Sequence, residues 1–138
     1  MVLRHRRLAA RALTFEEFLA REAKDGRLNL PLKKIAERAL LHGHCHQKAF
    51  GAVAPILDVI RLIPDAKPEL IESSCCGMAG SFGYEASHYD LSMQMAEASL
   101  LPALRRQPNA IVVADGTSCR HQIADCAGRE AIHVARLL

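Results

Sequence analysis

The segment from Ala110 to Ala114 reads Ala-Ile-Val-Val-Ala, a continuous apolar run rich in β-branched side chains. Such a run is typical of a strand that is buried on both faces, as happens when helices cover both sides of a parallel sheet. Two shorter segments, 39–41 and 69–72, are the other main strand candidates. Long stretches separate the three segments, and parallel strands need crossover connections of that kind. We therefore expect an α/β fold with a small parallel sheet and helical crossovers.

An N-terminal helical segment precedes this pattern. Residues 3–24 favour helix with a break near Thr14, which resembles an N-cap because Glu16 and Glu17 follow it. We divide the chain into this segment, residues 1–30, and a domain over 31–138.

The crossovers are predicted as helices over 50–63, from Ser87 to Pro102 and over 120–127, and a last strand or turn over 132–134. Ser87 and Asp90 have the spacing of a capping box. The apolar stripe expected on that helix consists of Leu91, Met95, Ala98 and Leu101, and Pro102 disturbs it. Gly128 is the expected stop of the last helix.

Composition narrows the class of protein. The chain has 138 residues, half of them apolar, and 18 Lys plus Arg against 15 Asp plus Glu. A net charge of +3 with four Phe and two Tyr lacks the basic stripe and aromatic platforms of nucleic-acid binding, so we expect no nucleic acid partner. No apolar run approaches the roughly 20 residues of a membrane span, and the basic start is not followed by a signal-peptide core. A cytoplasmic location is the expectation.

The cysteines are the chemical feature of the chain. There are five, an odd number, and Cys75 and Cys76 are adjacent, which a disulfide framework would rarely use. Cys45, the Cys75-Cys76 pair and Cys119 each follow a different predicted strand. Because the carboxyl ends of parallel strands form the binding edge of a sheet, these four thiols are expected to converge. Cys126 is predicted to stand outside the group as a small buried hydrophobe.

Thiolates are the soft ligands that iron-sulfur clusters, zinc and copper(I) select, and four of them satisfy one four-iron cluster. Glycines at 77 and 80 would let backbone N–H groups approach sulfur, although Gly77 could equally serve a turn. Two alternatives stay open. One is a zinc site formed by Cys45, Cys75 or Cys76, Cys119 and either His44 or His46, and the other is metal-free thiol redox chemistry at Cys75-Cys76.

Histidines surround the first thiol. His42, His44 and His46 alternate, so in an extended segment they would share one side while Cys45 faces the other. His44 or His46 could bind the metal group, donate to its sulfur or line a cleft. Lys48, and Arg120 with His121, could balance a negative cluster.

Three motifs carry a resemblance to a known family: 41–48 (LHGHCHQK), 72–85 (ESSCCGMAGSFGYE) and 115–122 (DGTSCRHQ). They resemble the cysteine-rich (Cys-Cys-Gly, or CCG) domain of iron-sulfur oxidoreductases, of the type found in heterodisulfide reductase and in the iron-sulfur subunit of glycolate oxidase. More narrowly, they are similar to the C-terminal region of fused FAD-linked oxidases of the D-lactate or D-2-hydroxyglutarate dehydrogenase type. The resemblance extends from about Ala12 onward.

The resemblance implies that Cys45, Cys75, Cys76 and Cys119 hold a 4Fe-4S cluster that relays electrons. It also implies partners: a flavin-containing dehydrogenase domain or subunit that carries the FAD, and a second cysteine-rich or ferredoxin-like domain. The chain would then be a component or C-terminal fragment of an oxidoreductase acting on 2-hydroxy acids, peripheral to a membrane through a partner at most.

One departure from the family pattern concerns the cluster type. Some members close the last motif with Cys-x-x-Cys, whereas here Gly116 and Gln122 stand three residues before and after Cys119. A cubane with four cysteine ligands, or three cysteines with another donor, fits these residues better than a five-thiolate cluster.

Overall fold

The computed structural model describes residues 2–35 and 38–138 and has a four-stranded, all-parallel sheet. Its strands are β1 (Arg38–Leu41), β2 (Lys67–Leu70), β3 (Ile111–Val113) and β4 (Ala131–Ile132), in the spatial order β2-β1-β3-β4. In register, Leu41 pairs with Leu70 of β2 and with Val113 of β3. The predicted α/β class is confirmed.

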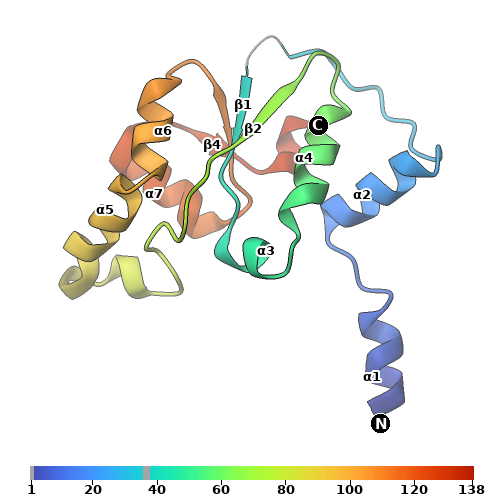
Figure 1. Cartoon of the computed structure of the whole chain (residues 1–138), viewed down its shortest axis with the longest axis horizontal. Helices are drawn as coiled ribbons and strands as arrows, with labels where there is room; N and C mark the ends of the chain where they lie inside the picture. The colour runs from blue at the N-terminus through green and yellow to red at the C-terminus, as the bar shows by residue number, and fades with distance from the viewer. Residues whose placement is uncertain (1, 36–37) are drawn as a thin grey trace.

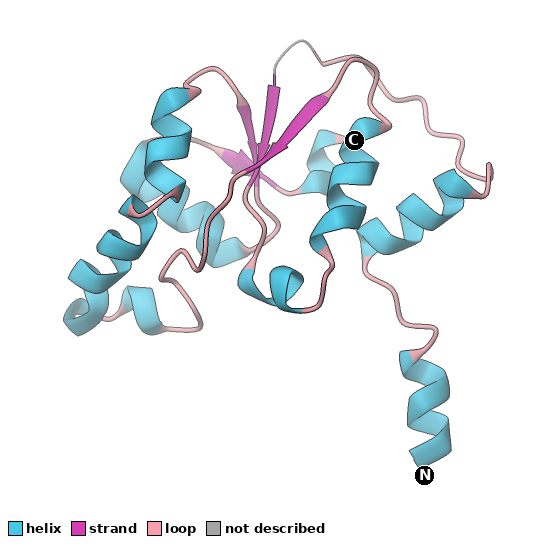
Figure 2. Ribbon diagram, viewed as in Figure 1, coloured by secondary structure: helices cyan, strands magenta, loops and turns pink. Residues whose placement is uncertain are grey.

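Helices cover both faces of this sheet (Figures 1 and 2). The helices of the described residues are α1 (Val2–Ala9), α2 (Phe15–Lys24), α3 (Cys45–Ala49), α4 (Val53–Arg61), α5 (Tyr89–Glu97), α6 (Leu100–Arg106), α7 (Thr117–Ala127) and α8 (Val134–Leu137), with short 3-10 turns η1 (Phe82–Tyr84) and η2 (Ala86–His88). Alternate strand residues face opposite layers. Leu40 and Val112 pack against α5, α6 and α7, whereas Leu41 and Val113 pack against α2, α4 and α8.

The N-terminal segment divides at the predicted position. Thr14 caps α2 in a capping box, in which Thr14 N donates to the Glu17 carboxylate (2.7 Å) and Glu17 N donates to Thr14 Oγ1 (3.3 Å). Helix α2 packs Leu19 into the core beside α4, whereas α1 extends away from the sheet and leaves Leu8 69% exposed (Figure 1).

The capping box predicted at Ser87 and Asp90 is wrong. Ser87 lies inside η2, and α5 begins at Tyr89 with His88 as its N-cap and no side-chain cap. Consecutive 3-10 turns bring the chain into α5, so the hydroxyl of Ser87 does not stand before the first helical turn.

The apolar stripe predicted for this region is also displaced. Leu91 is 49% exposed, and Ser92 and Ala96 face the core instead. The helix is interrupted before Pro102 rather than at it, because a proline ring inside a helix clashes with the carbonyl four residues earlier. The chain therefore breaks at 98–99, and Pro102 occupies the first turn of α6.

Other boundaries shift in ways that matter for the site. Helix α7 begins at Thr117 rather than at 120, which places Cys119 in its first turn, and Gly128 ends it in the left-handed conformation as predicted. The short helix α3 replaces the extended segment expected around Cys45. Strand β2 starts two residues early, because an edge strand tolerates Pro68. Among the described helices, none has the length and apolar character needed to cross a bilayer.

Candidate metal centre

Four of the five cysteines stand just beyond the carboxyl ends of β1, β2 and β3, which point to one edge of the sheet (Figure 2). Cys45 opens α3 after β1, Cys75 and Cys76 follow β2, and Cys119 lies in α7 after β3. None of the cysteines forms a disulfide within the described residues.

Two thiols form a buried inner pair. Cys76 and Cys119 are 3% and 1% exposed, and their sulfur atoms lie 3.6 Å apart. Hydrogen bonding with Cys119 lowers the pKa of Cys76, and a hydrogen bond from His42 lowers it further. The same contact with Cys76, together with burial, raises the pKa of Cys119. The two sulfur atoms thus share one hydrogen bond, which favours negative charge on Cys76 over Cys119.

The other two thiols, Cys45 and Cys75, form a half-buried outer pair. Burial raises the pKa of Cys45, and hydrogen bonding with Cys75 raises it further, while the charge of Lys48 acts in the opposite direction. The charges of Cys45 and Cys75 also raise the pKa of Cys119. All four thiols are thus within electrostatic reach of one another and form one group.

His42 is a site residue that the sequence analysis named beside His44 and His46 but gave no role. It is 1% exposed, and its ligand atom lies within 4.8 Å of the sulfur atoms of Cys76 and Cys119. Ser73 Oγ is 3.1 Å from His42 Nδ1, and Lys48 Nζ donates to that same hydroxyl at 3.0 Å. His42 directly follows the apolar strand candidate 39–41. This position next to a buried strand was the sequence signal that could have predicted a buried histidine at the site.

His44 and His46 are placed differently from the expectation of an extended segment. His44 caps α3, where its Nδ1 accepts from His46 N at 3.2 Å and its own N–H donates to Gln47 Oε1 at 2.9 Å. The predicted alternation is therefore wrong, since the chain turns into a helix at Cys45. Roles for His44 and His46 as ligands or donors to sulfur stay predictions.

The two glycines predicted to serve the cofactor differ in kind. Gly77 N–H donates to Cys75 Sγ at 3.3 Å, and a Cβ at this residue would lie 2.8 Å from Ser92 Cα. Gly80 has a φ of +56° and open space around it, so a turn is what it provides. A third glycine, Gly116, is as close-packed as Gly77, because its Cβ would meet the His44 ring at 2.5 Å and Cys119 Sγ at 3.0 Å.

Gln122, three residues after Cys119, is a buried side chain beside the inner pair. Its side chain is 2% exposed, and its Nε2 donates to the carbonyl of Cys76 at 2.6 Å and to Ser92 Oγ at 3.2 Å. The amide of Gln122 thus ties the backbone carbonyl of Cys76 to the Ser92 hydroxyl of α5.

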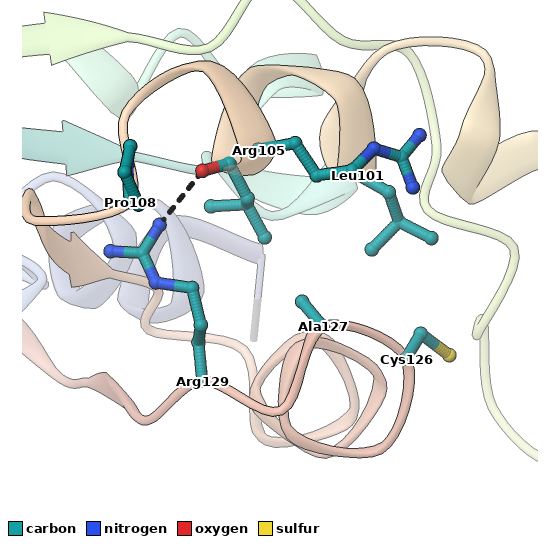
Figure 3. Close-up of a pocket in the computed structure, with 7 residues that line it drawn as sticks. Leu101, Arg105, Pro108, Cys126, Ala127 and Arg129 are labelled. Carbon is teal, nitrogen blue, oxygen red and sulfur yellow. Dashed lines mark hydrogen bonds between the residues drawn. The ribbon is translucent and has the colours of Figure 1, made fainter.

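The remaining candidates lie away from the thiols. Arg120 donates to the carbonyls of Ala114 and Asp115 and so fixes the turn after β3, and His121 Nδ1 bonds the Tyr84 hydroxyl at 2.9 Å on the surface. Cys126 Sγ lies 3.3 Å from Met93 Sδ. It also borders a separate cavity of about 460 Å³ between α6 and α7 (Figure 3).

The donor set fits a group that takes thiolate ligands. It offers four thiols from three strand ends, a buried imidazole and a backbone N–H directed at sulfur. Soft donors of this kind select iron-sulfur clusters or zinc, and N–H groups near sulfur stabilise the negative charge of a cluster.

Comparisons with known proteins agree with this chemistry. A subunit of the anaerobic glycerol-3-phosphate dehydrogenase of Escherichia coli (strain K12) is 30% identical over 121 residues, which are 88% of this chain and 30% of that protein. D-2-hydroxyglutarate dehydrogenase of the same strain is 37% identical over 73 residues, 53% of this chain and 7% of that protein. The corresponding dehydrogenase of Haemophilus influenzae (strain ATCC 51907 / DSM 11121 / KW20 / Rd) is 29% identical over 128 residues, covering 80% of this chain and 11% of that protein.

The chain is a distant homologue of regions of these dehydrogenases. It spans about 30% of the length of the glycerol-3-phosphate dehydrogenase component and a smaller share of the D-2-hydroxyglutarate dehydrogenases. No protein-family model matches it, and no solved structure gives a significant match.

Proposed function

We propose that this chain is an iron-sulfur electron-transfer module of an oxidoreductase, with Cys45, Cys75, Cys76 and Cys119 holding a 4Fe-4S cluster. The observation that carries the proposal is the gathering of four thiols beyond three separate strand ends at one edge of the sheet, with the sulfur atoms of Cys76 and Cys119 3.6 Å apart. A structural zinc site usually takes its ligands in close sequence pairs, which this chain lacks apart from the adjacent Cys75 and Cys76.

The cluster, when bound, supplies one-electron transfer. The protein residues hold and shield its ligands. His42, oriented by Ser73 and Lys48, donates a hydrogen bond to Cys76, and Gly77 N–H donates to Cys75. Both contacts stabilise negative charge on sulfur, which favours the reduced form and raises the reduction potential. Burial of Cys76 and Cys119 keeps water from that half of the site.

The partners follow from the relatives and from the family resemblance. We propose that electrons come from a flavin-dependent dehydrogenase domain or subunit, which carries the FAD, and pass to a downstream acceptor. A second cysteine-rich or ferredoxin-like domain would complete the path. D-2-hydroxyglutarate dehydrogenase among the relatives favours a 2-hydroxy acid as the substrate of the assembly. We propose a cytoplasmic location for this assembly.

One observation favours a second function. His42, Cys76 and Cys119 offer ligand atoms that lie within 4.8 Å of one another, and all three residues are buried. Together with a thiol of the outer pair they would form a four-ligand zinc site. The module would then be a zinc-stabilised domain without a role in electron transfer.

Anaerobic reconstitution with iron and sulfide distinguishes the two functions. The iron-sulfur proposal expects about four irons and about four sulfides per chain, with broad absorbance near roughly 400 nm that bleaches on reduction. Cys119→Ser should lose most of this iron, and Cys126→Ser is the matched control that should keep it. A colourless protein that retains about one zinc per chain would support the alternative instead.

A further inference from the structure

A second group of metal-ligating side chains lies at the carboxyl edge of the sheet, apart from the cysteines. Glu16 comes from the first turn of α2, Asp115 follows β3, and His133 precedes α8. Each offers one ligand atom, and these three atoms lie within 4.8 Å of one another. Three elements far apart in sequence therefore bring two carboxylates and an imidazole together.

Glu16 is the feature of this group that needs explanation. The residue is 5% exposed, yet among the described residues its carboxylate has no hydrogen bond and no ion pair. Its position in the first turn of α2 gives it a favourable helix dipole, and its oxygens keep a narrow contact with solvent, but a carboxylate on a side chain this deeply buried has lost most of its hydration and has no protein partner in return. A cation between Glu16 and Asp115 would supply the missing partner.

Asp115 and His133 are already held in place. The Asp115 side chain is 7% exposed, and it accepts from Gln47 Nε2 at 2.8 Å and from Val134 N at 3.0 Å. His133 Nδ1 lies 3.7 Å from Asp115 Oδ1 and accepts from Ala135 N at 3.1 Å. An ion bound through this nitrogen would replace the Ala135 contact, an exposed hydrogen bond of a four-residue helix.

We propose that Glu16, Asp115 and His133 form a binding site for a divalent first-row metal ion of the Mn²⁺ or Zn²⁺ class. Carboxylate and imidazole are the donors that such ions accept, and the two negative charges match the charge of the ion. Water completes the coordination on the exposed side of His133. The ion would join α2 to the carboxyl end of β3 and to the start of α8, so its role is to fix α2 on the domain.

The test uses Mn²⁺, because carboxylates suit this ion and thiolates select softer metals. Titration of the full chain, followed by the electron paramagnetic resonance of free Mn²⁺, should show about one tight site per chain. Glu16→Gln and His133→Gln should each lower the affinity at least about tenfold, the loss that removal of an outer-shell partner already causes. Mn²⁺ should also raise the melting temperature of the unsubstituted chain.

Glu130→Gln is the matched control. Glu130 is exposed, pairs with Arg136 at 3.2 Å and lies three residues before His133, so its removal subtracts the same charge from the same surface. This variant should bind Mn²⁺ like the unsubstituted chain. The proposal is overturned by absence of tight binding, by unchanged affinity in His133→Gln, or by an equal loss in the control. Circular dichroism shows whether each variant is folded, and His133→Gln decides if Glu16→Gln is not.

Discussion

Two ligand groups share one edge of this sheet and differ in almost every chemical respect. The thiol group (Cys45, Cys75, Cys76 and Cys119, with His42) is soft, and its inner pair lies in the core between the sheet and α5, α6 and α7. The carboxylate group (Glu16, Asp115 and His133) is hard and lies beside α2 and α8, in the opposite layer.

The difference arises within a few residues of β3. Asp115 lies in the connection after β3 and Cys119 in the first turn of α7, which has Gly116 as its N-cap, so two residues only four apart serve opposite layers. A parallel sheet gathers side chains at its carboxyl edge, and the alternation of faces sorts them into two environments. The chain after a single strand can therefore supply a carboxylate ligand to one layer and a thiol ligand to the other.

Gln47 connects the two groups. Its Oε1 accepts from His44 N, next to Cys45, and its Nε2 donates to Asp115 Oδ2. The two groups thus share one scaffold, and if they are the two sites proposed, selective changes should separate their properties.

The largest expected effect comes from removing the thiols. A variant with alanine at Cys45, Cys75, Cys76 and Cys119 should bind no iron after reconstitution, because all four thiols of the group are gone. Its affinity for Mn²⁺ should stay within about threefold of the unsubstituted chain, since the carboxylate group is untouched. Iron analysis and the Mn²⁺ titration measure both quantities. Loss of both metals together in a folded variant would show that the two groups form one site.

The next effect concerns the close packing on the thiol side. Gly77→Ala should lower the free energy of unfolding by roughly 2–5 kcal/mol, because its Cβ would collide with Ser92 and its φ is +85°. Gly80→Ala meets no atom within 4 Å and carries only the conformational cost of about 1–2 kcal/mol. Urea unfolding of the metal-free chain measures both values. Equal losses would mean that Gly77 contributes a turn and nothing more.

The smallest effect should follow from replacing Gln47, the residue that connects the two groups. Gln47→Met removes two partly buried hydrogen bonds and should cost about 1–2 kcal/mol of unfolding free energy. It frees one oxygen of Asp115, so Mn²⁺ affinity should change several-fold while iron content stays the same. Gln94→Met, at an exposed position of α5, is the control for the substitution itself. A fall in iron content in Gln47→Met would show that the scaffold couples the two sites.

Much of this architecture is readable from local pattern. The β-branched run 110–114 predicts a covered parallel strand, and the topology of such sheets then predicts that Cys45, Cys75 and Cys119 converge. Thr14 with Glu17 predicts the start of α2 because a capping box is a local hydrogen-bond pattern.

Features that depend on tertiary packing could not be predicted from the local sequence. The outward position of Leu91 and the inward one of Ser92 depend on how 3-10 turns bring the chain into α5. The proximity of His42 to Cys76 depends on where the chain turns after β1. Glu16 and Asp115 meet only because α2 packs beside α4 and α8, and no local spacing records that contact.

The strand order has a consequence for the way the protein matures. Strand β1 lies between β2 and β3, so Cys119 reaches the other thiols only after a chain loop of many residues has closed. No two of the three strand ends are close enough in sequence to hold a metal locally, in contrast to zinc fingers, where metal binding and folding coincide. If the proposed cluster forms, its insertion should therefore follow folding, with the folded apoprotein as the species that receives it.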